Sequence, residues 1–355
     1  MPGAVPLAGF LLHGLGARPG GNRGGNYLKG GTKLAKGTIG ISGFDFTKEQ
    51  MSRLYQEAKE LGINIREIPP GSTDPKWFAG CQALAGDYEL SAIEKATDMR
   101  WFHSDWSGVD SLVKLSPFRE KRAILTNSAG AYSVMIAEYI LAGCIMLLRH
   151  FPAYFEAQRQ CKWHEPLAGE SLSGKRITVL GLGRNGSAFA QLASSLGARV
   201  SGVNTSEREK PRWLERLYHI SQLNEALEKT DILVMCLPYT KETEKLIGSA
   251  ELAQLPRGAL LINTGRGQTL DMEALTIALA NSHLAGAMVD VFTKEPLPPE
   301  DPLWKVPNLV ITPHISGYTG DRLNTQGVFE IFLQNLVLWG RGQPLRNVVD
   351  IGKGY

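Results

Sequence analysis

The sequence predicts an α/β protein with two doubly wound parallel-sheet domains, the second a Rossmann dinucleotide-binding domain, and a cleft between them. Strand-like apolar runs alternate with helical segments over two stretches of the chain, as parallel α/β layers require. A glycine-rich turn, Gly-Leu-Gly-Arg-Asn-Gly over 181–186, follows one such run in the second stretch. With 355 residues, of which 43% are hydrophobic and 21% charged, the chain is long enough for two globular domains.

The first 36 residues are rich in glycine and show no apolar period, so we exclude them from the fold and expect a flexible tail. An organelle transit signal is the alternative, because the segment is basic and free of acids, although its glycines disfavour an amphipathic helix. The tail holds five cations, and removing them from the net charge of +3 leaves −2 for the remainder; they are Arg18, Arg23, Lys29, Lys33 and Lys36. The sequence therefore predicts no groove for nucleic acid.

The first α/β stretch begins with a strand over 38–42. Thr47 and Gln50 then form a capping-box pattern that opens a helix, and Gly62 ends that helix. Further strand-like runs of this stretch lie at 64–68, 83–84, 100–103 and 123–126.

The second stretch begins with a long helix, expected over 131–150. Its apolar run, 134–148, contains Glu138 and is shorter than a membrane span, so we expect a buried helix and no membrane partner. Strands are predicted at 177–180, 199–203, 231–236, 259–263, 287–292 and 309–312, and a terminal helix at 325–339.

Each glycine of the turn has its own predicted task. Gly181 permits the tight turn, Gly183 lets a pyrophosphate approach the backbone, and Gly186 lets the following helix pack closely on the strand. The helix N-terminus then offers free N–H groups to phosphate. The glycine spacing alone occurs in other turns; the strand before it and the helix after it make a dinucleotide site the favoured interpretation.

The four cysteines, Cys81, Cys144, Cys161 and Cys236, lie far apart, form no C-x-x-C pair and have no histidine at metal-ligand spacing. We therefore expect reduced structural cysteines, a cytoplasmic protein and no metal.

Several motifs together resemble the D-isomer-specific 2-hydroxyacid dehydrogenase family, over nearly the whole chain from Thr38 onward. These are 107–110 (Ser-Gly-Val-Asp), 125–128 (Leu-Thr-Asn-Ser), Ala137-Glu138, 262–267 (Ile-Asn-Thr-Gly-Arg-Gly), 289–296 (Val-Asp-Val-Phe-Thr-Lys-Glu-Pro), 312–317 (Thr-Pro-His-Ile-Ser-Gly) and 347–350 (Asn-Val-Val-Asp). The resemblance implies a discontinuous substrate domain, 37–140 with 325–355, and a dinucleotide-binding domain, 141–324.

The resemblance also implies a role for each matching residue. Arg266 would hold the substrate carboxylate and carbonyl, His314 would be the acid/base, and Glu295 would orient His314 and keep it protonated. The backbone N–H groups of Ser107 and Gly108 would bind the substrate carboxylate, and Asp290 would lie by the nicotinamide carboxamide. The other candidate cofactor-binding residues are Arg184, Asn185, Cys236, Leu237, Pro238, Thr264 and Gly265.

The reaction needs these residue types on chemical grounds as well. Hydride delivery to a 2-oxo acid builds charge on the carbonyl oxygen, so a proton donor must lie near that oxygen. Arginine suits the carboxylate because its planar fork makes two parallel hydrogen bonds. We therefore predict an NAD(P)-dependent oxidoreductase that interconverts a small 2-oxo acid and a D-2-hydroxy acid, in the direction of reduction. Candidate substrates are glyoxylate, hydroxypyruvate and phosphohydroxypyruvate.

The cofactor preference depends on a departure from the fingerprint. NAD-binding versions carry an acid about 20 residues past the last glycine, which binds the ribose and repels a 2′-phosphate. Here that position, 18 residues past Gly186, is Asn204. Thr205, Ser206, Arg208 and Lys210 follow with hydroxyls and cations, which favours NADP(H), although Glu207 and Glu209 keep NAD(H) open as the alternative.

Duller interpretations exist for these residues. Arg266 would then be a solvated loop residue, Glu295 a turn acid and His314 a capped surface residue, but all three follow successive strand candidates at the ligand-binding edge. A nicotinamide-sensing corepressor-like protein on the same fold is the rival function. The aromatic connector 151–163 predicts a homodimer, with His150 and His164 at the interface, whereas His103 is expected to be a packing residue.

Overall fold

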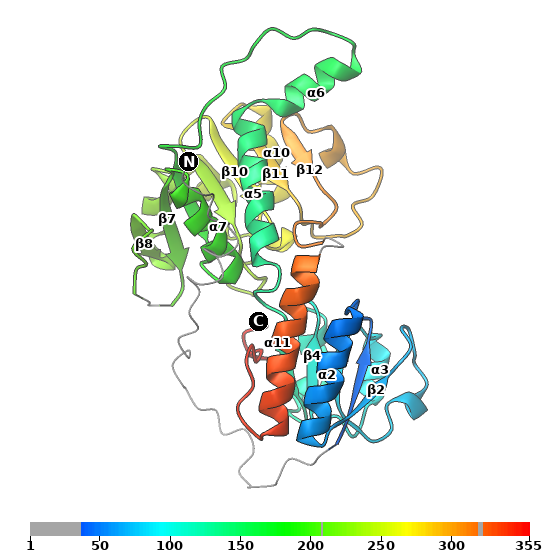
Figure 1. Cartoon of the computed structure of the whole chain (residues 1–355). Coiled ribbons are helices and arrows are strands. Elements are labelled where there is room, and N and C mark those ends of the chain that lie inside the picture. Colours follow the sequence, from blue (N-terminus) through cyan, green and yellow to red (C-terminus); the bar gives the residue numbers. More distant parts are fainter. Residues whose placement is uncertain (1–36, 207–208, 319–321) are drawn as a thin grey trace, which may run out of the picture. The chain divides into compact units, whose positions relative to one another are not determined.

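The computed structural model describes residues 37–206, 209–318 and 322–355, so the predicted tail lies outside the described part. These residues form two compact units (Figure 1). One unit comprises 37–106, 114–128 and 328–348, and the other comprises 107–113, 129–327 and 349–355. Both are α/β units with an all-parallel sheet, which confirms the predicted fold class. The predicted cleft between them stays a prediction.

The first unit contains a five-stranded sheet in the order β2-β1-β3-β4-β5, the flavodoxin-like doubly wound order. Its strands are β1 (Thr38–Ser42), β2 (Asn64–Glu67), β3 (Cys81–Gly86), β4 (Trp101–Ser104) and β5 (Ile124–Asn127). Its helices are α2 (Lys48–Leu61), α3 (Leu90–Lys95), α4 (Ser116–Arg119) and the larger part of α11 (Arg322–Gly340).

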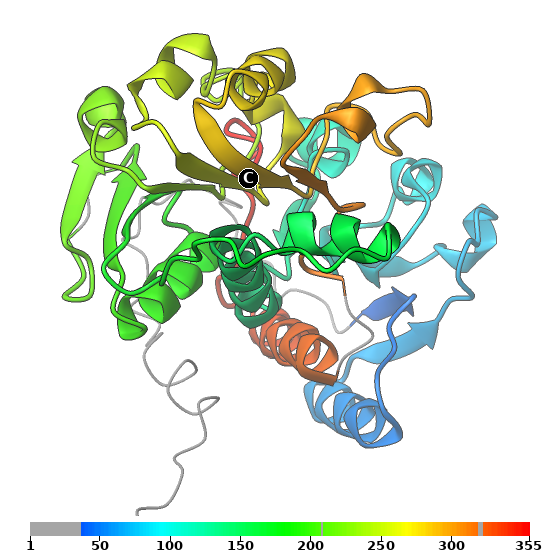
Figure 2. The same ribbon diagram turned by 90° about the horizontal axis from the view of Figure 1, so that it is seen from above.

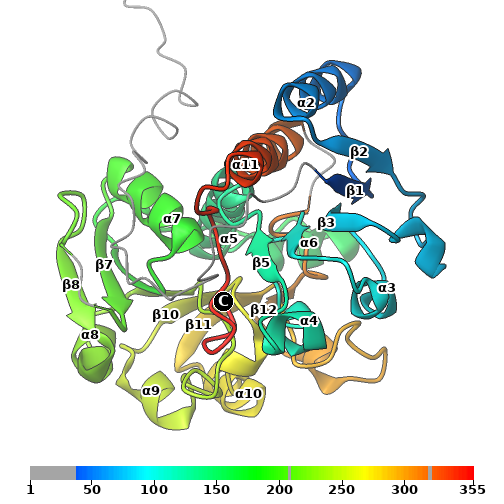
Figure 3. The ribbon, with the colours of Figure 1, turned by 90° about the horizontal axis from the view of Figure 1, so that it is seen from below.

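Helices α2 and α11 lie side by side on one face of this sheet (Figures 1 and 3). Leu54 of α2 packs with Phe332 of α11 in one buried core, where Trp101 of β4 contacts both Phe332 and Trp339. The capping box predicted for α2 is present, because Thr47 and Gln50 exchange backbone and side-chain hydrogen bonds of 2.8 and 3.2 Å. The predicted terminal helix therefore completes the first unit.

The second unit contains a seven-stranded sheet in the order β12-β11-β10-β9-β6-β7-β8. Its strands are β6 (Arg176–Leu180), β7 (Arg199–Asn204), β8 (Arg216–His219), β9 (Ile232–Met235), β10 (Ala259–Asn263), β11 (Leu284–Val289) and β12 (Leu309–Ile311). Its helices are α5 (Ser133–Leu148), α6 (Phe151–Arg159), α7 (Arg184–Ser195), α8 (Leu223–Leu227), α9 (Ser249–Gln254) and α10 (Met272–Ala280). The strand order reverses between β6 and β9, and dinucleotides bind at such a switch point.

The two faces of the second sheet are covered by different helices (Figures 2 and 3). Helices α5 and α7 form one core with Ile177, Val234 and Ile262, and helices α8, α9 and α10 form the other with Leu233 and Leu261. Successive residues of β9 and of β10 therefore point into different cores. This alternation is expected of strands that are buried on both faces. The glycine turn of the dinucleotide fingerprint thus directly follows β6, a central strand whose two faces are both covered by helices.

The structure differs from the sequence-based expectation at strand β8, at the domain boundary, and at β11, which spans Leu284–Val289 where 287–292 was predicted. Strand β8 was missed, because only Tyr218 of its four residues is buried and no apolar run marks it. The predicted boundary at 140 falls inside α5, whereas the compact units divide at 128 and 129, since Ile136, Ala137 and Ile140 already pack in the core of the second unit. The substrate and cofactor roles of the two domains stay a prediction.

Helix α5 is largely buried, as the sequence predicted for 134–148. In the described ranges, no single helix has both the length and the apolar composition to cross a membrane. The bent pair α5 and α6, at 70°, meets those two criteria only jointly.

Candidate active site

Two glycines, Gly181 of the glycine turn and Gly265 after β10, lie against the backbone that follows β9. A Cβ on Gly181, whose φ is +88°, would lie 2.8 Å from the Cys236 carbonyl oxygen, and one on Gly265 would lie 2.5 Å from the Leu237 carbonyl oxygen. Gly186 packs similarly on the turn, since its Cβ would lie 2.1 Å from the Gly181 oxygen. The structure therefore brings predicted cofactor-binding residues from three loops together at one sheet edge.

The start of α7 provides an open cradle for phosphate. Gly183 is the N-cap of this twelve-residue helix without a side-chain cap, and a Cβ built on it has no neighbour within 4 Å. The first N–H groups of a helix have no partner within the helix, and the space at Gly183 is open, which suits a pyrophosphate. Asn185 is held from α5, where the Ser133 hydroxyl donates to its side-chain oxygen at 2.8 Å. The residues present fit a dinucleotide.

The end of β7 is the expected ribose site. Asn204 donates from Nδ2 to the Ser206 hydroxyl at 2.8 Å, and the His219 Nε2 lies 3.2 Å from the Thr205 carbonyl oxygen. Lys210 instead donates to the Leu214 carbonyl at 2.7 Å. Arg208 lies outside the described residues. His219 was missed by sequence reasoning because it ends the unpredicted β8, paired with Asn204 across the strands.

Arg266 follows β10 in a loop that buried Asn263 shapes. The Asn263 side-chain oxygen accepts from the Gly265 N–H at 3.0 Å, and its amide donates to the Arg266 carbonyl at 3.3 Å. Gly267 lies against the backbone of Phe292, because its Cβ would lie 2.2 Å from the carbonyl carbon of that residue. The loops after β10 and β11 are therefore packed backbone to backbone, and the one after β10 fixes the start of the Arg266 side chain.

Glu295 and His314 form a hydrogen-bonded pair across the loops that follow β11 and β12. The Glu295 Oε2 lies 2.7 Å from the His314 Nδ1, and its Oε1 accepts from the Phe292 N–H at 2.8 Å. With Nδ1 donating to the carboxylate, Nε2 is the nitrogen left to exchange a proton with a ligand. The His314 side chain is 47% exposed and the Glu295 side chain is 36% exposed, so a ligand can reach the pair.

Asp290 fastens the loop that carries His314. Its side chain is fully buried, and its oxygens accept from the backbone N–H groups of Ile315 and Ser316, each at 2.9 Å, and from the Thr312 hydroxyl at 2.7 Å. These bonds hold the backbone of His314 in the left-handed region, at φ +54°, which is uncommon for a residue other than glycine. The expected contact of Asp290 with the nicotinamide stays a prediction.

Tyr139 of α5 joins this network. Its hydroxyl lies 3.2 Å from the Asp290 Oδ1 and also bonds the Thr312 hydroxyl. Burial raises the pKa of Tyr139, so the phenol stays protonated. Sequence reasoning missed this residue, although it directly follows the quoted Ala137-Glu138 motif.

Ser107, Gly108 and Asp110 belong to the second unit, although the chain around them belongs to the first. Asp110 accepts from the Arg266 Nε at 3.0 Å and from its Nη2 at 2.9 Å. The predicted substrate residues 107 and 108 therefore lie in the segment that contacts Arg266. His103 is confirmed as a packing residue, because it is fully buried between Thr126 and Phe332.

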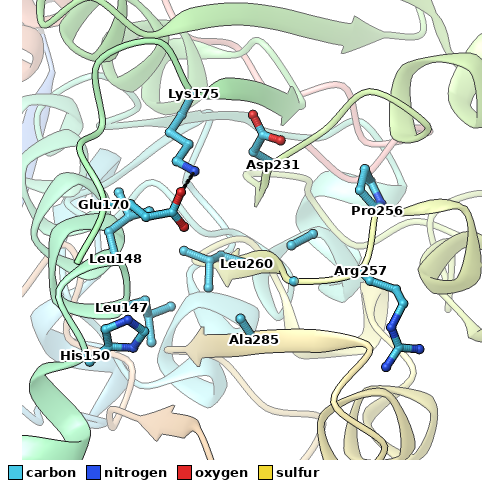
Figure 4. A pocket seen from close by; sticks show the side chains of 12 residues that line it. Leu147, Leu148, His150, Glu170, Lys175, Asp231, Pro256, Arg257, Leu260 and Ala285 are labelled. Atoms are coloured by element: carbon cyan, nitrogen blue, oxygen red, sulfur yellow. Dashed lines mark hydrogen bonds and ion pairs between the residues drawn. The ribbon is translucent and has the colours of Figure 1, made fainter. Parts of the chain in front are cut away.

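A cavity in the second unit lies apart from this site (Figure 4). It has a volume of about 250 Å³ and lies where β6, β9 and β10 begin, lined among others by Lys175, Asp231 and Arg257. Because the strands are parallel, this is the edge opposite the glycine turn and the His314 loop. The cavity thus gives no support to any predicted site residue.

The second unit combines a Rossmann sheet and an open phosphate cradle with an Arg, a Glu and a His that follow three adjacent parallel strands. These features together define a nicotinamide-dependent oxidoreductase. Residues 141–316 match the family model described as "D-isomer specific 2-hydroxyacid dehydrogenase, NAD binding domain". The glyoxylate reductase of Thermofilum pendens is 34% identical over 64% of this chain and 68% of its own length. The glyoxylate reductase of Korarchaeum cryptofilum is 31% identical over 83% and 91%.

A solved structure shows the same relationship. The D-isomer specific 2-hydroxyacid dehydrogenase from Xanthobacter autotrophicus, in complex with NADPH and MES, aligns with a TM-score of 0.76 at 28% identity, over 90% of this chain and all of the other. The chain belongs to the D-isomer-specific 2-hydroxyacid dehydrogenase family and is an NAD(P)-dependent oxidoreductase. No comparison supports the corepressor-like alternative.

Proposed function

We propose that the protein is a reductase of small 2-oxo acids, with glyoxylate and hydroxypyruvate as its preferred substrates. The observation that carries the proposal is the Glu295–His314 pair after β11 and β12, together with Arg266 after the adjoining strand β10. The names of the two archaeal relatives support glyoxylate. Phosphohydroxypyruvate remains the third candidate substrate.

The residues have these proposed roles. Arg266 binds the substrate carboxylate with its guanidinium, and the Ser107 and Gly108 N–H groups add further donors. His314 gives the proton on Nε2 to the carbonyl oxygen, while Glu295 holds the other ring nitrogen and stabilises the charged ring. The bound nicotinamide supplies the hydride. Gly181, Gly183 and the first turn of α7 would hold the pyrophosphate of the dinucleotide cofactor.

The deciding experiment follows the loss of nicotinamide absorbance with a panel of 2-oxo acids that contains glyoxylate, hydroxypyruvate and phosphohydroxypyruvate. We expect turnover of about 10 per second with the preferred acid. Nucleotide binding without turnover of any acid would refute the proposal and favour a sensing protein.

We further propose that NADPH is preferred to NADH. Asn204 places an uncharged amide where an acid would repel the 2′-phosphate, and the Thr205 and Ser206 hydroxyls adjoin it. Asn204→Asp should lower kcat/KM for NADPH by roughly tenfold to a hundredfold and should not lower kcat/KM for NADH, because the new carboxylate repels the 2′-phosphate but can accept from the ribose hydroxyls of NADH. A parent enzyme that prefers NADH would contradict this proposal.

A homodimer and a cytoplasmic location complete the proposal. The connector after α5 carries Phe151, Phe155 and Trp163, which are 42%, 48% and 95% exposed. Such large aromatic side chains are rarely left in water together. Among the described residues the cysteines are all unpaired, which fits a reducing compartment.

A further inference from the structure

The Arg266 side chain is held at one edge of its guanidinium by Asp110. A single oxygen, Oδ2, accepts from both Nε and Nη2, at 3.0 and 2.9 Å. On the other side, Nη1 donates to the carbonyl oxygen of Gly265 at 2.8 Å. The guanidinium is thus fixed at two opposite sides by partners from two different loops.

These contacts decide which part of the guanidinium faces a ligand. Of the five N–H groups of an arginine, three are used here, which leaves one on Nη1 and one on Nη2. Because Asp110 bridges Nε and Nη2, the remaining Nη2 hydrogen points to the Nη1 side. We infer that the Gly265 carbonyl, which belongs to the neighbouring residue, takes the Nη1 hydrogen on the Cδ side, so the end-on edge is the edge presented to a carboxylate.

Gly108 adds a steric contact from the same segment. A Cβ on Gly108 would lie 2.4 Å from the Arg266 Nη2 and 3.5 Å from the Asp110 Oδ2. The segment 107–110 therefore lies directly against the guanidinium, with glycine where the arginine needs room. The exposed fraction is 27% for the arginine side chain and 41% for the aspartate, so a solute can reach the pair.

We propose that Asp110 is a positioning residue that turns the end-on edge of Arg266 toward the substrate carboxylate. The proposal rests on the function proposed above. An arginine side chain has large rotational freedom, and a partner that removes this freedom before binding lowers the entropic cost of binding. In this proposal Asp110 acts through Arg266 and takes no part in hydride or proton transfer.

The first test measures binding and turnover in Asp110→Ala and Asp110→Asn. Oxamate, an unreactive isostere of a 2-oxo acid, is titrated into the NADPH-loaded protein by calorimetry, and KM and kcat are measured with glyoxylate. We expect Asp110→Ala to raise the oxamate Kd and the glyoxylate KM about tenfold, with a smaller change in kcat and an unchanged NADPH Kd. Asp110→Asn should lie between parent and alanine, because its amide oxygen can still accept the two N–H groups.

Glu215→Gln is the matched control. Glu215 also bonds one arginine twice, to Arg199 at 2.9 and 2.6 Å, and is 39% exposed, but it lies at the strand edge opposite the site. Substitution of Glu215 should leave the oxamate Kd, the NADPH Kd, and the KM and kcat for glyoxylate unchanged. In an Arg266→Lys background, Asp110→Ala should have little further effect, because the group that it positions is already absent.

The outcomes separate this proposal from the function on which it rests. Tighter oxamate binding in Asp110→Ala would overturn the proposal and make Asp110 a competitor of the substrate. Parent-like oxamate and glyoxylate constants would also overturn it, while turnover by the parent would leave the function intact. A parent that turns over no 2-oxo acid would overturn the function, and oxamate binding would then still report on the Asp110 contact.

Discussion

At the scale of single residues, His314 and Glu295 have unequal tasks. His314→Gln removes the proposed proton donor, so kcat should fall by roughly a hundredfold or more. Glu295→Gln keeps one oxygen, which can still accept from the His314 Nδ1 although the bond from the Phe292 N–H to the other oxygen is lost, so kcat should fall only about tenfold. Steady-state kcat at saturating cofactor measures both. A His314→Gln enzyme with near-parental kcat would refute the assignment of the proton donor.

His103 and Asp105 lie one residue apart around the end of β4 and titrate in opposite senses. Burial lowers the pKa of His103 to about 3, and burial, with Asp87 nearby, raises the pKa of Asp105 to about 7. A lowered histidine pKa gives stability that is present at high pH and is lost as pH falls below the unfolded value of about 6.5. A raised aspartate pKa gives stability that is present at low pH and is lost as pH rises from about 4 toward about 7.

The two effects should largely cancel between about pH 4 and about pH 6.5. In Asp105→Asn only the histidine effect remains, so the free energy of unfolding should rise with pH, by at most about 1.4 kcal/mol per pH unit relative to the parent. In His103→Gln it should fall with pH by a similar slope. Urea unfolding at several pH values measures these slopes. Parallel profiles for the two variants would contradict the prediction.

At the scale of elements, the strand–turn–helix of β6 and α7 uses its glycines for two purposes. Gly183→Ala introduces a methyl group into open space, so it should leave Tm unchanged while it weakens NADPH binding about tenfold, through crowding of the pyrophosphate. Gly186→Ala would place its Cβ 2.1 Å from the Gly181 oxygen, so it should lower the free energy of unfolding by about 1 to 3 kcal/mol. Thermal melts and NADPH titrations of both variants distinguish the roles. A large loss of Tm in Gly183→Ala would show that the cradle is a packing feature.

At the scale of the whole molecule, the connector determines the expected assembly. Phe155→Ser with Trp163→Ser should convert a dimer into a monomer, because these side chains are exposed in the single chain. Light scattering at micromolar concentration gives the molar mass. Ile277→Ser is the control, since Ile277 is 56% exposed but lies on α10 and should leave the dimer intact. A monomeric parent would rule out the assembly.

Much of the fold follows from local sequence. Buried parallel strands such as β6 and β10 read as apolar runs because both faces are covered, and the capping box of α2 is a pattern of two residues. The site residues Arg266, Glu295 and His314 follow the ends of strands, and parallel strands bring their ends to one edge. Family motifs along the chain gave them their chemical roles.

The sequence by itself determined the fold class and the glycine turn, and its family motifs predicted Glu295 and His314 as the acid/base pair. Only the tertiary structure showed β8, the division of the chain before α5, the network of Asp290 with Tyr139, and the contact of Asp110 with Arg266. The contacts of Asp290 with Tyr139 and of Asp110 with Arg266 join partners far apart in sequence, separated by 151 and 156 positions. A local pattern records how a segment buries its own side chains. It does not record which distant carboxylate will orient a given guanidinium, because that choice is made when the loops pack.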